Sequence, residues 1–380
     1  MNQNQNRGQD HHQDRNQDAA VYRRLADHLN RLPAGFPATP TGVELKVLKR
    51  LFTPDQARLA QQLTLKPETP DQIAERCRLT AAELAPQLED LAAHGLIFRI
   101  RKGPAVLYMA AQFLIGIWEY HVNDLDPELI RDMNQYIPYF FDQAQQNRTP
   151  QLRTIPVPGA VNAQQTVMAY EEARGIVGAQ DKIVVAPCIC RKEQRMVGKG
   201  CHRPLESCLV FGLGAQYYED NRLGRGITRD EALTILERAE QAGLVLQPSN
   251  AQKVVNICTC CGCCCQILKN LKKLPKPAEH VMSNFVARVD ADRCSGCETC
   301  LERCQMEAIT VAEATAVVAQ ERCIGCGLCV PTCPEQAIEL TAKPAELRQT
   351  PPAHLLETYS RIAAERLQRL QVQSNRGAIS

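Results

Sequence analysis

Apolar residues recur at helical spacing in several short segments between Thr41 and about Tyr108, and polar capping residues precede these segments. Four starts have the side chains that cap a helix: Thr41 with Glu44, Thr53 with Gln56, Thr80 with Glu83, and Thr69 before Pro70. Gly95 then fits a helix stop. The pattern predicts a series of short helices that ends near Gly95.

Two strand-like runs follow, LIFRIRK and AVLYMA, separated by the turn Lys102-Gly103-Pro104. Short helices followed by a two-stranded hairpin resemble a winged helix-turn-helix domain. An aromatic helical segment and the Pro-containing stretch TPQLRTIPVPGAV come next. We therefore expect a winged-helix-like domain over residues 21–150. Residues 1–20 contain nine Asn or Gln and almost nothing apolar, which predicts a disordered tail.

The rest of the chain divides at turn-rich linkers. The segment KIVVAP predicts a short strand leading into Cys188, and Thr228 with Glu231 caps a helix that Gly243 ends. We expect a Cys-rich α/β middle domain over residues 151–275. The linker KKLPKPAEH, a third domain over residues 285–342, and a C-terminal helix and tail over residues 343–380 follow. The predicted fold class is α+β multidomain.

Composition restricts the class of protein. The 380 residues are 44% hydrophobic and 23% charged, with a formal net charge of +2, as in ordinary soluble proteins. Near-neutral charge gives no large field for binding nucleic acid or anionic membrane. The longest apolar stretch, Ala105 to Trp118, is interrupted by Gln112 and is too short to cross a bilayer. Without a secretory signal in residues 1–20, we expect a cytoplasmic protein without a membrane span.

The chain has 19 cysteines, an unusual number for this length. Disulfide frameworks belong mostly to short secreted proteins, and this count is odd. All cysteines except Cys77 fall into three clusters, at 188–208, 258–265 and 294–333. Close clustering suits thiolates that converge on a metal centre, so we interpret most of them as reduced metal ligands.

The last eight cysteines form a repeat. Cys294-x2-Cys297-x2-Cys300-x3-Cys304 recurs 29 residues later as Cys323-x2-Cys326-x2-Cys329-x3-Cys333-Pro334. This duplicated spacing resembles a bacterial-type ferredoxin that holds two [4Fe-4S] clusters, in which the fourth cysteine of each run ligates the other cluster. The resemblance implies two ligand sets: Cys294, Cys297, Cys300 and Cys333 for the first cluster, and Cys304, Cys323, Cys326 and Cys329 for the second.

Two features of the repeat qualify this interpretation. Gln305 stands where the second run has Pro334, a change that leaves every thiolate in place. Zinc also takes four thiolates, so a pair of zinc sites is the alternative. Zinc sites usually pair two CxxC units across a longer gap, and the duplicated run therefore favours the two clusters.

Ten further cysteines lie in APCICRKEQRMVGKGCHRPLESC and NICTCCGCCC. These motifs, placed before a ferredoxin module, resemble a widespread but poorly characterised family of multidomain prokaryotic iron–sulfur proteins. Ten thiols exceed what one tetrahedral ion or one cubane needs, and adjacent cysteines cannot all face one centre. The metal-ligand candidates are Cys188, Cys190, Cys201, Cys208, Cys261 and Cys264. A further iron–sulfur cluster, a structural zinc, or partly unliganded thiols remain open for this block.

The predicted winged helix raises the question of DNA binding. Between Thr41 and Ala110 there are ten basic and eight acidic residues, and the candidate recognition helix from Thr80 to His94 has no Lys or Arg. DNA affinity depends on basic side chains that neutralise phosphates. The charges therefore favour docking to protein, or a homodimer through the N-terminal domain, over binding to DNA.

The combined interpretation is an electron-transfer protein or oxidoreductase subunit with two [4Fe-4S] clusters and one further iron–sulfur cluster or zinc ion. No GxGxxG fingerprint and no P-loop is present, so a redox protein is the expected partner. The ferredoxin segment from Val286 to Ala342 has nine acidic and four basic residues, which suits a basic partner face. The alternatives are a redox-sensing or iron–sulfur-sensing regulator that binds DNA, and an enzyme with an open metal position in the middle block.

Overall fold

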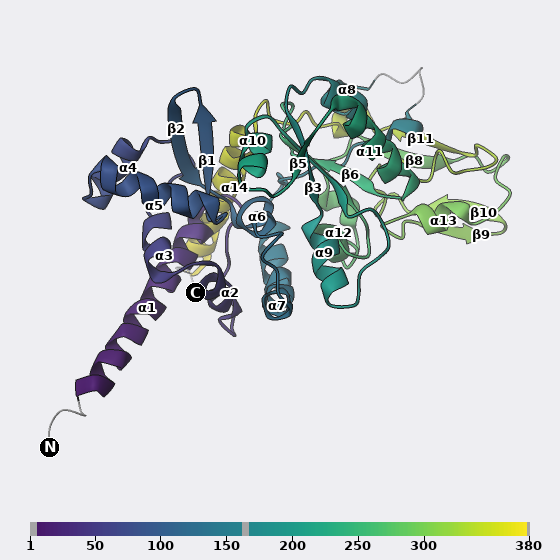
Figure 1. Cartoon of the computed structure of the whole chain (residues 1–380). Coiled ribbons are helices and arrows are strands. Elements are labelled where there is room, and N and C mark those ends of the chain that lie inside the picture. Colours follow the sequence, from purple (N-terminus) through teal and green to yellow (C-terminus); the bar gives the residue numbers. More distant parts are fainter. Residues whose placement is uncertain (1–5, 162–166, 378–380) are drawn as a thin grey trace. The chain divides into compact units, whose positions relative to one another are not determined.

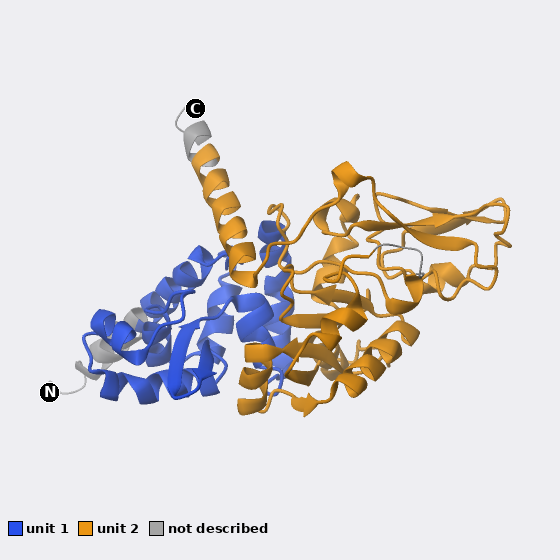
Figure 2. Ribbon diagram, turned by 90° about the horizontal axis from the view of Figure 1, so that it is seen from above, with its two compact units in different colours: residues 1–144 blue, residues 145–380 orange. Residues whose placement is uncertain are grey.

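The structure, a computed structural model, describes residues 6–161 and 167–377, with side chains from 18–161 and 167–372. The chain forms two compact units, Met1–Ala144 and Gln145–Ser380 (Figure 2). The boundary between them lies close to the one predicted at residue 150. No helix within the described residues has both the length and the apolar character needed to cross a membrane.

Unit 1 is mainly helical (Figure 1). Its elements are α1 (Asn6–Arg31), α2 (Val43–Leu51), α3 (Pro54–Ala60), α4 (Pro70–Cys77), α5 (Ala81–Ala93), β1 (Ile97–Lys102), β2 (Ala105–Ala110), α6 (Trp118–Tyr120) and α7 (Pro127–Ala144). The helix α1 begins at Asn6, within the segment 1–20 for which the sequence predicts a disordered tail, and residues 1–5 lie outside the described part. Val21, Leu25 and Leu29 of this helix are buried, so packing of its second half anchors the polar turns before it.

Most of the predicted helix starts are confirmed. Complete capping boxes precede α3, α4 and α5, at Thr53, Thr69 and Thr80. The start predicted at Thr41 is wrong: Gly42 precedes α2 and adopts a φ of 66°. Thr39 acts instead, since its hydroxyl accepts a hydrogen bond from the Val43 amide at 3.2 Å and its own amide donates to Glu44 at 3.2 Å.

The helices α4 and α5 lead into an antiparallel hairpin of β1 and β2, in which Lys102 pairs with Ala105 next to the turn. Glu68 forms an isolated bridge with Tyr108 and so adds a short third strand to this hairpin. The helix–helix–hairpin order is the one that the sequence predicts. The core of the unit contains Phe36, whose ring centroid lies 4.6 Å from that of Phe113 and 4.8 Å from that of Tyr136.

Unit 2 is built on a five-stranded sheet with the order β5-β3-β4-β7-β6. Every neighbouring pair in it is antiparallel, so the α/β architecture expected for the middle domain is corrected to α+β. The strands are β3 (Ile183–Pro187), β4 (Glu206–Phe211), β5 (Arg225–Ile227), β6 (Val245–Pro248) and β7 (Asn256–Cys260). The helices of this part are α8 (Ala173–Gly178), α9 (Ile189–Met196), α10 (Gly212–Asp220), α11 (Arg229–Gln241) and α12 (Gln266–Leu271).

The cysteine repeat contains two short pairs of antiparallel strands. In one of them β8 (Phe285–Val289) pairs with β11 (Ile338–Ala342), and in the other β9 (Ile309–Ala312) pairs with β10 (Thr315–Val318). A short helix, α13 (Thr299–Arg303), lies with β9 and β10 at one end of the unit (Figure 1). The pair β8 and β11 joins the segment before the first cysteine run to the segment after the second.

The parts of unit 2 that the sequence separates are joined by hydrogen bonds. The Val157 amide donates to the carbonyl of Cys326 at 3.0 Å, so the segment before the sheet contacts the cysteine repeat. The C-terminal helix α14 (Leu355–Gly377) is held through Thr358, whose hydroxyl donates to the carbonyl of Asn250. The stretches 151–275, 285–342 and 343–380 therefore share one compact unit.

Candidate functional site

The last eight cysteines gather as two sets of four. Those of the first set line one cavity of unit 2: Cys294, Cys297, Cys300 and Cys333. The second set is Cys304, Cys323, Cys326 and Cys329, in which burial, together with electrostatic repulsion from neighbouring thiolates, raises the thiol pKa values of Cys323, Cys326 and Cys329. We call these the outer and the inner set. Each contains three cysteines of one run and the fourth of the other, which is the grouping that the resemblance implies.

The backbone hydrogen bonds to sulfur repeat with the same 29-residue offset. The amides of Ala316 and Ala337 donate to Cys294 at 3.4 Å and Cys333 at 3.3 Å in the outer set. The equivalent amides, of Ala287 and Ala308, donate to Cys323 at 3.5 Å and Cys304 at 3.2 Å in the inner set. Amide donors stabilise negative charge on thiolate sulfur, so the cysteines of both sets are suited to act as thiolate ligands.

Two glycines make the loops of the repeat tight. Gly296 and Gly325 occupy equivalent positions with φ values of 69° and 67°. A Cβ atom at Gly296 would lie 2.5 Å from the carbonyl oxygen of Ala314, and one at Gly325 would clash with the carbonyl oxygen of Phe285. Both positions therefore require glycine for its conformation and for the close approach of backbone.

Exposure separates the two sets. Cys297 of the outer set is exposed, and hydrogen bonding from Thr299 lowers the pKa of its thiol. In the inner set Cys323 and Cys329 are buried, and burial raises the pKa of Cys326 to about 12. A bound metal would have to displace the proton of Cys326, since the free thiol keeps it at neutral pH.

A third group forms in the middle block from Cys201, Cys261, Cys263 and Cys264. Their sulfur atoms all lie within 4.8 Å of one another, and among the described residues this is the group of three or more ligands that converges on a single metal position. The sulfur of Cys201 is 4.0 Å from that of Cys261 and 3.7 Å from that of Cys264. Tetrahedral bonds of ~2.3 Å from sulfur to zinc place sulfur atoms ~3.8 Å apart, so these four fit one tetrahedral metal ion. We call them the quartet.

Arginines surround the loop of the quartet. Arg203 donates to the sulfur of Cys263 at 3.4 Å, and Arg195 donates to the backbone carbonyls of Cys201 at 3.0 Å and Arg203 at 2.6 Å. Burial raises the pKa of Cys201, but hydrogen bonds from the Arg203 backbone and from neighbouring thiols outweigh it and lower this pKa to about 7. Cys201 therefore becomes a thiolate at lower pH than Cys261 and Cys264, whose thiol pKa values burial raises.

The other six cysteines of the middle block form a closed ring of neighbouring thiols, in which each thiol shifts the pKa of two others. In order around the ring they are Cys188, Cys190, Cys265, Cys260, Cys258 and Cys208, which returns to Cys188. Hydrogen bonds from their neighbours lower the pKa of every second thiol, that of Cys258 to about 5, and raise the pKa of the thiols between them. Three ring members are buried and three are half-buried.

The structure thus divides the six middle-block candidates. Cys201, Cys261 and Cys264 meet in the quartet, whereas Cys188, Cys190 and Cys208 belong to the ring. Cys263, which sequence reasoning left out, completes the quartet, and the ring adds Cys258, Cys260 and Cys265. The alternating and doubled cysteines of NICTCCGCCC are the sequence signal that two groups of thiols, the quartet and the ring, share this segment.

A direct contact joins the quartet loop to the inner set. The buried amide of Gly262, between Cys261 and Cys263, donates to the side-chain oxygen of Gln305 at 2.8 Å. Gln305 follows Cys304 and occupies the position where the second run has Pro334. The departure from the repeat therefore provides the acceptor that links the two metal-ligand loops.

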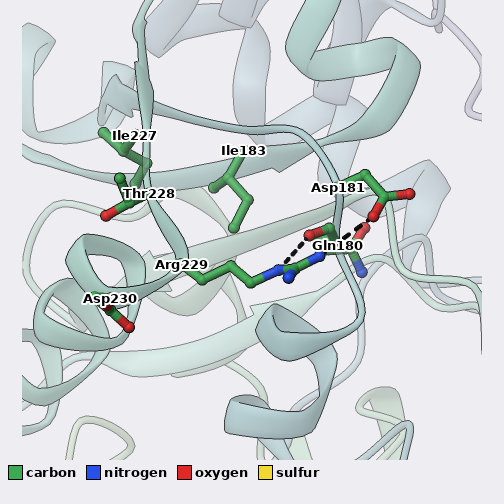
Figure 3. A pocket seen from close by; sticks show the side chains of 7 residues that line it. All are labelled: Gln180, Asp181, Ile183, Ile227, Thr228, Arg229 and Asp230. Atoms are coloured by element: carbon green, nitrogen blue, oxygen red, sulfur yellow. Dashed lines mark hydrogen bonds and ion pairs between the residues drawn. The ribbon is translucent and has the colours of Figure 1, made fainter.

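A surface pocket at the edge of the sheet contains no cysteine. It is lined by Gln180, Asp181, Ile183, Ile227, Thr228, Arg229 and Asp230 (Figure 3). Arg229 donates to the carbonyl oxygen of Gln180 at 2.7 Å and to the carboxylate of Asp181 at 3.2 Å. Because these contacts engage the one basic side chain lining it, the pocket offers no unpaired cation for an anionic ligand.

Comparison with known proteins identifies one part of the chain. The family model of a 4Fe-4S dicluster domain matches residues 287–340, the segment that contains both four-cysteine sets. Neither the curated proteins nor the solved structures gave a significant match. The chain thus contains a segment similar to a 4Fe-4S dicluster domain, and the cysteines of that segment supply the thiolates that iron–sulfur clusters require.

Proposed function

We propose that this protein is a cytoplasmic electron-transfer protein with one [4Fe-4S] cluster at the outer set and one at the inner set. Cubanes at these positions would take up and release single electrons. The third metal centre would be the quartet, holding a tetrahedral ion, zinc or iron. The protein would exchange electrons with a separate redox protein.

The observation that carries the proposal is the repetition of the sulfur environments. Each set has four thiols, two amide donors to sulfur and an equivalent left-handed glycine, Gly296 or Gly325, all related by the same 29-residue offset. A disulfide network or a solvated thiol cluster has no need for such matched donors. Two equivalent clusters that gain negative charge on reduction do need them.

The residues around the two sets suggest that a protein partner would dock at the outer set, while the inner set is linked to the quartet. Cys297 and Glu298 expose the outer set to solvent, where a protein partner would dock. The excess of acidic residues between Val286 and Ala342 suits a basic face on that partner. The inner set is joined through Gln305 to the quartet, and this link would keep the quartet at a fixed position beside the inner cluster.

Anaerobic reduction tests this proposal. Protein reduced with dithionite and freed of excess reductant is mixed with oxidised cytochrome c, a basic haem protein used as the probe. We expect rapid reduction of the haem and a rate that falls as salt increases, because screening weakens the attraction between unlike charges. The variant Cys77→Ser serves as the control, because Cys77 lies outside the two sets, the quartet and the ring. Protein that does not transfer electrons to the haem would refute the proposal.

The regulator alternative is disfavoured by contacts in unit 1. The hairpin arginines Arg99 and Arg101 form ion pairs with Glu89 of α5, and Arg76 pairs with Glu68 at 2.7 Å. Arginines held by carboxylates are less available to phosphates. We infer that unit 1, winged-helix-like in its order of elements, docks to protein or forms a homodimer. Salt-sensitive binding to DNA in a mobility-shift assay in any redox state would revive the alternative.

A further inference from the structure

The ring of six thiols is a candidate site separate from the quartet. Four strand and helix segments supply its members: the junction of β3 and α9 gives Cys188 and Cys190, β4 gives Cys208, β7 gives Cys258 and Cys260, and the start of α12 gives Cys265. The strands β3, β4 and β7 are consecutive neighbours in the sheet. The ring is therefore held by the rigid centre of unit 2 rather than by a loop.

The arrangement does not suit a single metal ion. Each ring thiol has two other ring thiols as neighbours, and six thiols exceed the four that a tetrahedral ion accepts. Within the described residues it is the quartet, and no trio of ring members, that converges on one metal position. Six thiols spread around a closed ring fit the periphery of a centre that contains several metal atoms.

A buried cation, Arg191, lies next to the ring and needs a negatively charged partner. Arg191 is 0% exposed and donates to the carbonyl oxygen of Thr259 at 2.7 Å and to the hydroxyl of Ser207. None of its partners among the described residues is a carboxylate, and its Nε has no hydrogen-bond partner. Burial lowers the pKa of Arg191, but the thiolates of the middle block, first of all Cys188 and Cys208, outweigh this effect and raise that pKa.

The buried carboxyl of this region does not neutralise Arg191. Glu193, 0% exposed, accepts a hydrogen bond from Gln266 instead. A buried guanidinium without a counter-ion is strongly destabilising. An anionic centre bound by ring thiolates would supply the missing charge at the required place.

We propose that Cys188, Cys190, Cys208, Cys258, Cys260 and Cys265 together bind a polynuclear iron–sulfur cluster, with Arg191 as its buried counter-cation. Iron and sulfide are favoured over a zinc–thiolate cluster because the same chain contains a 4Fe-4S dicluster segment, which requires their delivery. To that extent the inference rests on the proposed function. The cluster would lie in the same compact unit as the quartet and the inner set.

Metal analysis of the full chain, purified without oxygen, tests the ring. Two cubanes account for about eight irons per chain, and we expect at least four more. The double variant Cys208→Ser/Cys258→Ser should lose these extra irons and an equivalent amount of sulfide, while keeping the signals of the dicluster segment. The matched control Cys77→Ser, which lies outside the ring, the quartet and the dicluster segment, should keep them.

A second measurement covers the case in which the double variant does not fold. The variant Cys297→Ala/Cys326→Ala removes ligands from both sets of the dicluster segment and leaves the ring intact. It should still contain at least four irons with Mössbauer parameters of an iron–sulfur cluster. This result would support the ring even if the dicluster assignment failed. Ring cysteines found as disulfides, zinc in place of iron, or wild-type iron of about eight with no loss in the ring variant would each overturn the proposal.

Discussion

The outer and the inner set are two copies of one ligand pattern in different surroundings. Both have the same thiol spacing, the same left-handed glycine and the same pair of amide donors. They differ at the positions that do not ligate. Glu298, Gln305 and Met306 belong to the first run, where the second has Gly327, Pro334 and Glu335. The repeat determines how sulfur is placed, and the departures determine what each set contacts.

Removing one thiol from each set gives the largest expected difference. Cys297→Ala and Cys326→Ala should each lose about four of the eight irons of the dicluster segment. Cys297 is exposed, whereas Cys326 is half-buried and its carbonyl accepts a hydrogen bond from the Val157 amide. We therefore expect the thermal midpoint of unfolding to fall more for Cys326→Ala. Equal midpoints in calorimetry would show that the surroundings of the two sets do not differ in stability.

Substitutions at Gly327 and Glu298 should give the next largest difference between the two sets. Both residues have positive φ, 74° and 64°, but a Cβ at Gly327 would clash with that of Ala160 and approach the side chain of Leu340 at 3.3 Å. Gly327→Ala should lower the free energy of unfolding by about 2–4 kcal/mol through strain and overpacking. Glu298→Ala, at the equivalent position of the first run, should change it by less than about 1 kcal/mol. Denaturant unfolding of both variants measures the contrast.

Substitution of Gln305 tests the hydrogen bond that links the inner set to the quartet loop. Gln305→Pro restores the residue of the second run but leaves the buried amide of Gly262 without its acceptor, which costs about 1–3 kcal/mol. We expect faster loss of the quartet metal to a chelator, with the iron of the dicluster segment retained. The reciprocal Pro334→Gln should leave the chelation rate unchanged. An unchanged rate in Gln305→Pro would mean that the hydrogen bond does not hold the quartet loop.

The smallest effect concerns charge. Glu335 is exposed and lines the cavity of the outer set, whereas its equivalent in the first run, Met306, is buried. Glu335→Gln removes one negative charge near the outer set and should raise the reduction potential of that site alone, because less charge opposes reduction. Redox titration followed by EPR measures both potentials. A shift at the inner site instead would reverse their assignment.

Much of this structure is predictable from sequence because its signals are local. Capping pairs such as Thr53 with Gln56, the hairpin of unit 1 and the 29-residue repeat all depend on residues close together in the chain. The division of the middle cysteines is not local. Cys188 and Cys265 belong to one ring because α9 and α12 start near the same strands, and spacing alone cannot separate them from Cys201 and Cys264. The contact of Gln305 with Gly262 likewise depends on the packing of distant segments.

EPR of the reduced wild-type protein, combined with iron and sulfide quantitation, tests the central claim most directly. The account predicts coloured protein with at least eight irons and as many sulfides per chain. On full reduction, two [4Fe-4S] clusters close enough to interact should give a spin-coupled spectrum, and Cys297→Ala should reduce it to the signal of one cluster. Colourless protein with zinc in place of iron at the eight cysteines would contradict the account.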